Sequence, residues 1–247
     1  MLEYKYEIYS KKNTKAADKP NEDFVYVNGK LGVGMVLDGV SRDRENGIYP
    51  SPSPAKEAVN LFSEAALRNN EIEKKSGIYR IQTMICDGND ELKKYNMNLN
   101  HRFPAGTVGV VFSIENGKFI YGYIGDCYAA IIRDDNMRVF TECQTEMIAK
   151  HKKEFTSDEI RFDICNHISH PCGYGVWNGD KNAMDFVKYG SIQVCRGDII
   201  YIYTDGMKEL LEKLELSDLA ENIMPKLEEL EYGKVLDDRT YIKIKFE

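Results

Sequence analysis

Apolar residues alternate with polar ones, or run together in short stretches, over much of the chain, and both patterns predict β-strands. The stretches that fit lie at residues 4–9, 24–27, 31–37, 107–114, 118–125, 127–134, 137–141, 186–194, 198–204 and 241–246. Asn116-Gly117 separates two of them, and an Asn-Gly pair between strands is a strong hairpin signal. We therefore expect residues 107–134 to form an antiparallel meander.

Helices are predicted where apolar residues recur at helical spacing. The clearest begins at Pro54, with Ser53 as its cap. A second helical region covers roughly residues 71–100 and is expected to break near Asp87-Gly88-Asn89. Further helices are expected between residues 205 and 231. Strands, helices, a meander, more helices and a last strand together predict an α+β sandwich of two antiparallel sheets flanked by helices.

Composition narrows the function classes. The 247 residues fit one large domain or two small ones, and we expect a single domain over residues 1–247. The net charge is −7 and no basic run stands out, which argues against nucleic-acid binding. The chain shows neither an apolar signal core at its start nor a stretch near the roughly 20 residues of a membrane span. We therefore expect a soluble, cytoplasmic protein.

The cysteines change this interpretation little. Six are present, none in a CxxC pair, and reduced buried thiols are the simplest interpretation. Cys165, His167, His170 and Cys172 lie close together, but their spacing matches none of the usual zinc patterns.

Aspartates stand where several apolar runs end. They are Asp23, Asp38, Asp126, Asp205 and Asp237. If these strands share a sheet, the carboxylates point into one region, where they repel one another and are costly to desolvate. Mg²⁺ or Mn²⁺ removes both problems, because these hard cations prefer oxygen ligands. The pattern predicts a carboxylate metal site.

For any single aspartate near a glycine, a turn-forming role is the ordinary alternative. We assign Asp198, in Arg196-Gly197-Asp198, to a tight turn before a strand, and Asp238 to a turn or to a supporting position behind the site.

The motifs taken together resemble the metal-dependent serine/threonine protein phosphatases of the PPM family (type 2C). They occur in the family's order as NEDF at 21–24, VLDGV at 36–40, AGTVGVV at 105–111, YIGDCYAAI at 123–131, RGDIIYIYTDGM at 196–207 and DDRTYIKI at 237–244. Each motif is weak alone, but their ordered combination over most of the chain is specific.

The resemblance implies a four-layer α-β-β-α sandwich that binds two Mg²⁺ or Mn²⁺ ions at one end of the paired sheets. By matching positions, Asp38 would bridge both metals, together with the carbonyl of Gly39. Asp23 would lie near one metal, directly or through water, and Asp205 and Asp237 would hold the other. These four aspartates would be the catalytic carboxylates.

Asp126 matches the family acid that helps to bind a third, weaker metal. The implied reaction is hydrolysis of phosphoserine or phosphothreonine in proteins by a water between the metals. Two adjacent cations lower the pKa of that water and neutralise charge on the transferring group, so no covalent nucleophile is required. The implied partner is a phosphorylated protein, such as a kinase or its target, and a monomer is expected.

The sequence departs from the family at the phosphate-binding arginine that precedes the first acidic pair. Asp18 stands near that position with Lys19 beside it. We predict Lys19 as the phosphate-binding residue, although a lysine offers a point charge rather than a bidentate fork. Lys15, Arg42 and Arg44 are alternatives.

A second departure follows Asp38-Gly39. Some members of the family carry a histidine at this turn that is credited as general acid, whereas this chain has Val40. Both departures motivate an alternative function, a phosphatase-fold binding or regulatory module with weak or no catalysis. A phosphatase for small phosphorylated metabolites is a third possibility.

Overall fold

The computed structural model describes residues 2–41, 43–44, 47–68 and 74–247, and two five-stranded antiparallel sheets form its centre. In the first sheet the strand order is β1 (Tyr4–Lys11), β10 (Arg239–Phe246), β9 (Ile199–Tyr203), β6 (Tyr128–Arg133) and β7 (Asn136–Val139). In the second it is β2 (Asp23–Asn28), β3 (Val33–Gly39), β4 (Thr107–Glu115), β5 (Lys118–Ile124) and β8 (Lys188–Gln193). The meander predicted over residues 107–134 is divided between them: β4 and β5 pair in the second sheet, and the chain then crosses to β6 in the first.

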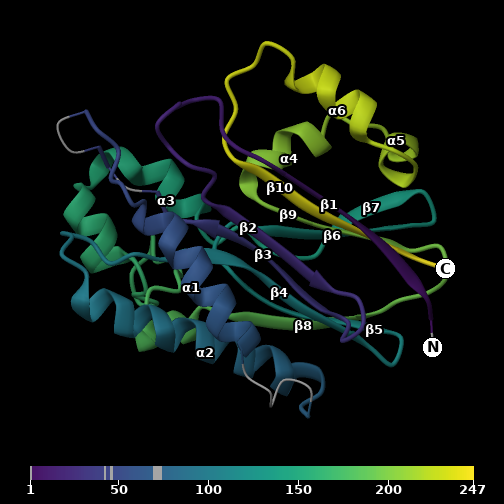
Figure 1. The fold of residues 1–247 in the computed structure, drawn as a ribbon, viewed down its shortest axis with the longest axis horizontal. Coiled ribbons are helices and arrows are strands. Elements are labelled where there is room, and N and C mark those ends of the chain that lie inside the picture. Colours follow the sequence, from purple (N-terminus) through teal and green to yellow (C-terminus); the bar gives the residue numbers. More distant parts are fainter. Residues whose placement is uncertain (1, 42, 45–46, 69–73) are drawn as a thin grey trace.

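Helices cover the outer faces of both sheets (Figure 1). Helices α1 (Pro54–Arg68) and α2 (Gly77–Asn98) lie on the second sheet, against β2 to β5. Helices α4 (Asp205–Leu211), α5 (Leu216–Ala220) and α6 (Met224–Glu231) pack on the first. The predicted α-β-β-α sandwich is confirmed. Among the helices of the described residues, none combines the length and apolar character needed to cross a bilayer.

The strand β9 shows why its sequence is apolar without interruption. Ile200 and Ile202 belong to the large core that includes residues of both sheets. Ile199, Tyr201 and Tyr203 face the other way, into the core under α4 to α6. Since successive strand residues point to opposite faces, a strand covered on both sides must be apolar at every position.

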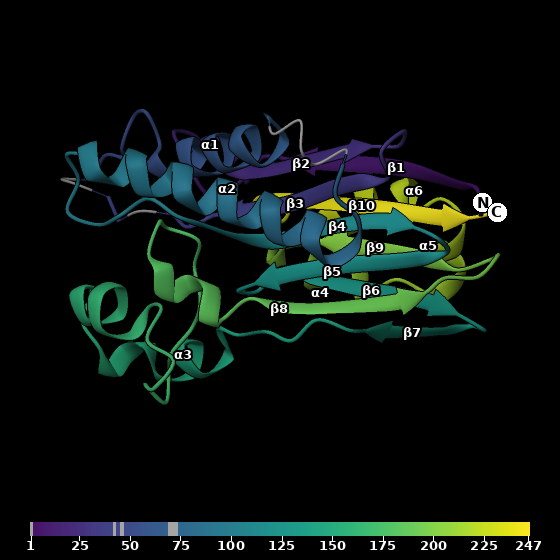
Figure 2. The ribbon, with the colours of Figure 1, turned by 90° about the horizontal axis from the view of Figure 1, so that it is seen from below.

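The segment between β7 and β8 forms few regular elements. It contains helix α3 (Glu146–His151), a 3₁₀ turn (Lys152–Glu154), a π-helical segment (Glu159–Ile164) and a second 3₁₀ turn (Lys181–Asp185). Figure 2 shows this segment grouped beside the end of the sandwich that lies away from the two chain termini.

Helix α2 continues through Asp87-Gly88-Asn89, so the predicted break is wrong. Gly88 faces helix α1, where a Cβ atom would come within 2.6 Å of the Phe62 ring. Asn89 accepts a hydrogen bond from the Gly179 amide (2.9 Å) and donates one to the Asp180 carbonyl (3.2 Å). Both residues that suggested a turn are therefore used for contacts with other parts of the fold.

This contact predicts that Gly88→Ala destabilises the protein. In an exposed helix the same change would stabilise by about 1 kcal/mol, but here the added methyl overlaps Phe62, and overpacking costs about 1–3 kcal/mol. Chemical denaturation measures the difference, with Asp90→Ala on the exposed side of α2 as the control. A neutral or stabilising Gly88→Ala would show that the two helices do not approach this closely.

Candidate metal centre

The predicted aspartates gather at one end of the sandwich. Asp23 begins β2 and lies directly opposite Asp38, near the end of β3, in the antiparallel register. Asp126 lies in the turn between β5 and β6, Asp205 begins α4 just after β9, and Asp237 precedes β10. The ends of five strands thus deliver these carboxylates to one region.

A pocket of about 320 Å³ opens between these strand ends. Four of the five aspartates line it, namely Asp38, Asp126, Asp205 and Asp237, and Gly39 and Lys19 line it as well. Asp23 is 3% exposed and lies beside Asp38, outside the lining. The fold therefore brings together all the side chains predicted for the metal site.

Asp38 lies at the electrostatic centre of this group. The side chain is half-buried at the pocket, and desolvation by the surrounding protein raises the pKa of Asp38 well above its usual value. The charges of the four other aspartates, Asp23, Asp205, Asp126 and Asp237, raise that pKa further. Like charges directly opposite on neighbouring strands are destabilising, so a nearby cation would stabilise the Asp23–Asp38 pair.

Asp23 has one carboxylate oxygen with a partner and one without. Its Oδ2 accepts a hydrogen bond from the Thr204 hydroxyl at 3.0 Å. Its buried Oδ1 has no hydrogen-bond partner among the described residues. Burial raises the pKa of Asp23 to about 7, with contributions from the charges of Asp238 and Asp205. A buried oxygen without a donor is a position that a cation or an ordered water would satisfy.

Asp205 and Asp126 complete the acidic side of the pocket. Asp205 keeps solvent contact at the pocket mouth, yet desolvation by the surrounding protein, followed by the charges of Asp126 and Asp237, raises its pKa to about 6. Burial also raises the pKa of Asp126, although a 2.9 Å hydrogen bond from the Thr145 hydroxyl partly lowers it.

The adjacent acids Asp237 and Asp238 both border the pocket, but their carboxylates have different partners. Asp238 accepts hydrogen bonds from the Asn13 amide at 2.6 Å and the Glu22 amide at 3.0 Å, so both its oxygens are used inside the protein. Burial alone would raise the pKa of Asp237, but an ion pair with Lys15 at 2.6 Å and the charge of Lys19 leave that pKa lowered. The assignment of Asp237 to the metal site stays a prediction.

Two further residues fix the backbone at this pair. Arg239 is fully buried, donates to the Asp237 carbonyl at 2.8 Å, and pairs with Glu231 at 2.8 Å. Gly206 lies so close to the chain before β10 that a Cβ atom would be 1.9 Å from the Asp238 carbonyl oxygen. The glycine after Asp205 therefore allows the two metal-side segments to touch.

Asp198 lies at a turn, as predicted. Its carboxylate accepts a hydrogen bond from the Cys195 amide at 2.7 Å and pairs with Arg133 at 2.5 Å.

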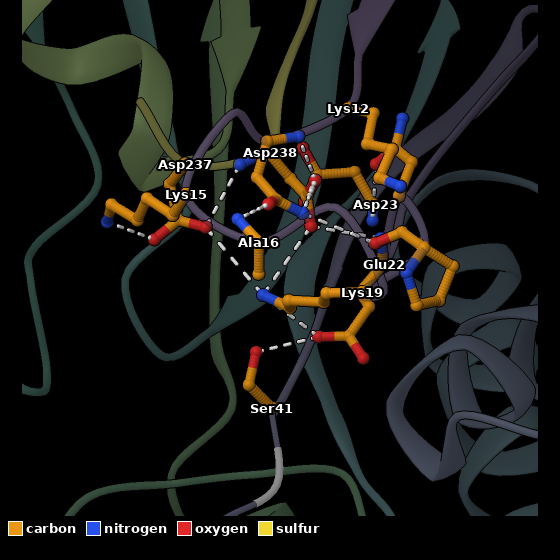
Figure 3. A network of polar contacts seen from close by, with 12 residues as sticks. Lys12, Lys15, Ala16, Lys19, Glu22, Asp23, Ser41, Asp237 and Asp238 are labelled. Atoms are coloured by element: carbon orange, nitrogen blue, oxygen red, sulfur yellow. Dashed lines mark hydrogen bonds and ion pairs between the residues drawn. The ribbon is translucent and has the colours of Figure 1, made fainter. Parts of the chain in front are cut away.

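The predicted phosphate-binding residue Lys19 and its alternative Arg44 are already engaged with acids. Lys19 lies 3.1 Å from Glu22 and within 3.7 Å of Asp237 and Asp238 (Figure 3). Burial lowers the pKa of Lys19, but the charge of Glu22 and its neighbours outweighs it, and the net shift is upward. Arg44 forms a two-pronged ion pair with Asp18, at 2.6 and 2.7 Å, away from the pocket lining. Arg42 lies outside the described residues.

Glu22 is the important residue that the sequence analysis left without a role. It is fully buried and accepts hydrogen bonds from the Tyr49, Ser53 and Ser41 hydroxyls. Lys19 completes this set. The motif Asn-Glu-Asp marks its position, but the hydroxyl partners lie in the loop before α1 and only the fold reveals them.

Thr107 has a related supporting role, because its hydroxyl donates a 2.7 Å hydrogen bond to the Asp38 carbonyl.

The donor set fits hard divalent cations that keep part of their water shell. Within the described part of the chain, no three acidic, histidine or cysteine side chains form a ready-made metal cage. Magnesium sites commonly use one or two carboxylates with several waters, rather than a closed shell of protein ligands. The orphaned Asp23 oxygen, the crowded charges on Asp38 and the open pocket suit such a site.

Comparison with known proteins identifies the fold. No protein-family model matches the sequence, and no curated protein matches it. The Mycobacterium tuberculosis serine/threonine phosphatase PstP/Ppp matches with a TM-score of 0.69, 17% identity and coverage of 100% of both chains. The catalytic domain of PstP in complex with two manganese ions matches with a TM-score of 0.69 and 16% identity, and the match covers 100% of this chain and 99% of that one. The PPM phosphatase MsPP from Mycobacterium smegmatis, in complex with cacodylate, matches with a TM-score of 0.61 and 14% identity, and the match covers 98% of each chain.

At these identities the likeness establishes the architecture. The chain has the fold of the PPM-type serine/threonine phosphatases, and the predicted resemblance is confirmed at that level.

Without divalent cations, we expect the protein to lose stability as the pH rises from about 4 to about 7. The pKa values of Asp23 and Asp205 are raised to about 7 and about 6 in the folded state, whereas an unfolded aspartate ionises near pH 4. The folded state binds more protons in this window, so stability falls as they are released. Thermal melts in EDTA at about pH 5 and about pH 8 measure the effect. Saturating Mn²⁺ should remove the difference, and a metal-free protein that is more stable at the higher pH would contradict the assignment.

The variant Asp38→Asn tests the source of this instability. The substitution keeps the shape of the side chain and removes its negative charge, which the four other aspartates repel. At about pH 8 the metal-free variant should melt higher than the wild type, by about 2–4 °C for each kcal/mol of repulsion relieved. Its stabilisation by Mn²⁺ should be lost. A variant that Mn²⁺ stabilises as strongly as the wild type would place the metal elsewhere.

Proposed function

We propose that residues 1–247 form one metal-dependent phosphatase domain of the PPM family, which removes phosphate from phosphoserine or phosphothreonine in proteins. One observation carries the proposal. Carboxylates from strand ends far apart in the sequence surround a single open pocket, and the charges of four of them act on Asp38. Such an arrangement is unstable alone and is suited to divalent cations.

The similar structures support the same proposal. PstP/Ppp is a serine/threonine phosphatase, and the catalytic domain of PstP has been solved with two manganese ions. For this chain we propose two Mg²⁺ or Mn²⁺ ions and a third, weaker one. Asp38, the Gly39 carbonyl, Asp23, Asp205 and Asp237 would hold the pair, and Asp126 the third.

When bound, such cations lower the pKa of a water and neutralise charge on a phosphoryl group. The chain's own residues prepare the site for that chemistry. Thr204 and Thr107 fix Asp23 and the Asp38 backbone through hydrogen bonds, and Arg239 fixes the Asp237 carbonyl. Positioned ligands of this kind cost no reorganisation when the reaction occurs.

The binding-module alternative keeps specific support. The position near the family's arginine holds Asp18, whose carboxylate pairs with Arg44, and the turn after Asp38-Gly39 holds Val40. The phosphate-binding role of Lys19, the cytoplasmic location, the monomeric state and a kinase or its target as partner remain predictions.

We expect Asp38→Ala and Asp205→Ala each to reduce Mn²⁺-dependent hydrolysis of p-nitrophenyl phosphate by at least about 100-fold, because each removes a ligand from the proposed metals. Circular dichroism should show that both variants keep their fold. The matched control is Asp90→Ala on the exposed side of α2, which should retain wild-type activity.

Full activity in both pocket variants would exclude the proposed site. Manganese binding by the wild type in calorimetry, without phosphate release from any of several phosphopeptides, would instead favour the binding module. Release from small phosphometabolites alone would favour a metabolite phosphatase.

A further inference from the structure

The pocket has a second wall of different chemistry. Beyond the strand ends, the lining comes from the segment that contains α3 and the residues after it. This part is largely apolar, with the residues Ile148, Ala149, Ile160, Tyr174 and Val176. A single charged residue, Lys152, lies among them.

Lys152 shares a helical face with the apolar lining residues. The 3₁₀ segment follows α3 without a gap, and Ile148 and Lys152 are four positions apart across their junction. Residues at this spacing lie on the same side of a helix. The next residue, Lys153, is exposed and does not line the pocket. The sequence thus places one of two adjacent lysines at the pocket.

Two lysines line the pocket, and they differ in what they contact. The ammonium of Lys19 lies within 3.7 Å of three carboxylates, so its charge already balances acids of the protein. Lys152 is exposed, and its ammonium has neither an ion pair nor a hydrogen bond with any residue that the structure describes. Of the two, Lys152 is the cation available to an incoming anion.

Four other basic side chains near this end are engaged as well. Lys15 pairs with Asp237, Lys56 donates to the Asp23 carbonyl at 2.8 Å, and Arg161 donates to the Ser41 carbonyl at 3.1 Å. Arg44 pairs with Asp18. Among the described residues that line this pocket, Lys152 is therefore the lysine able to meet a phosphate without first losing an internal partner.

We infer that Lys152 binds the phosphate of the substrate from the second wall of the pocket. The inference rests on the proposed function and names a residue outside the sequence motifs. An ammonium beside apolar surface attracts an anion more strongly than one in bulk water. Because lysine is a flexible point charge, the contact should strengthen binding of substrate and product more than it aligns the reacting atoms.

The test compares Lys152→Met, Lys152→Arg and the neighbouring control Lys153→Met. With p-nitrophenyl phosphate and saturating Mn²⁺, Lys152→Met should raise KM about tenfold and change kcat less than about threefold. The inhibition constant of inorganic phosphate should rise by a similar factor. Lys152→Arg should restore both values, Lys153→Met should leave them unchanged, and the Mn²⁺ concentration for half-maximal activity should be the same in all four proteins.

Each other outcome has a definite meaning. Unchanged KM and phosphate inhibition in Lys152→Met would overturn the inference and leave the proposed function intact. An effect seen only with phosphopeptides that carry acidic flanking residues would assign Lys152 to those residues, and would also overturn it. A changed Mn²⁺ requirement would point to a structural role instead.

If the wild-type protein releases no phosphate, the proposed function is excluded, and the inference is then tested by phosphate binding alone. Calorimetry with inorganic phosphate and the Mn²⁺-loaded protein should show about tenfold weaker binding by Lys152→Met than by the wild type. Equal binding, or no binding by the wild type, would overturn it.

Discussion

Repulsion among carboxylates at one end of the two sheets is the constraint on which the arrangement of this site depends. The β2–β3 register places Asp23 directly opposite Asp38, and β9 and β10 bring Asp205 and Asp237 to the same end. The register is also the one that packs the core, so the charges cannot move apart without disturbing the sheets. The result is a group of acids whose pKa values are raised at Asp23, Asp38 and Asp205. Divalent cations at this end would offset the repulsion.

The protein limits this repulsion by dividing each acidic pair between two environments. In Glu22-Asp23, Glu22 is saturated by hydroxyl groups and Lys19, while one oxygen of Asp23 has no hydrogen-bond partner in the described part of the chain. In Asp237-Asp238 both acids border the pocket, but Asp238 is saturated by backbone amides, whereas Asp237 pairs with the exposed Lys15. The pairs are joined directly, because Asp238 accepts its bond from the Glu22 amide. One acid of each pair thus builds the scaffold that holds the other.

Much of this was predictable because it depends on local pattern. Period-two alternation locates the strands, and a carboxylate at the end of an apolar run marks each aspartate that the fold brings to this end. The features that the sequence analysis missed or predicted wrongly depend on partners distant in the sequence. Gly88 signals a helix break by its own propensity, whereas in the structure it makes room for Phe62. Glu22 has hydroxyl partners in a loop that no periodicity marks. The pairing of Arg44 with Asp18 likewise required the fold, because either charge alone suggests a free surface residue.

The same reasoning explains why one lysine is poorly suited to two tasks. A cation that neutralises buried acids lowers the free energy of the folded protein by staying in contact with them. An anionic substrate would have to share that cation with the acids or displace them, and either change weakens an interaction that holds the site together. Lys19 is bound by Glu22, Asp237 and Asp238 and meets the first demand. Binding of the anionic substrate is therefore the task of a different element. The segment after β7 supplies Lys152, and no acid among the described residues competes for it.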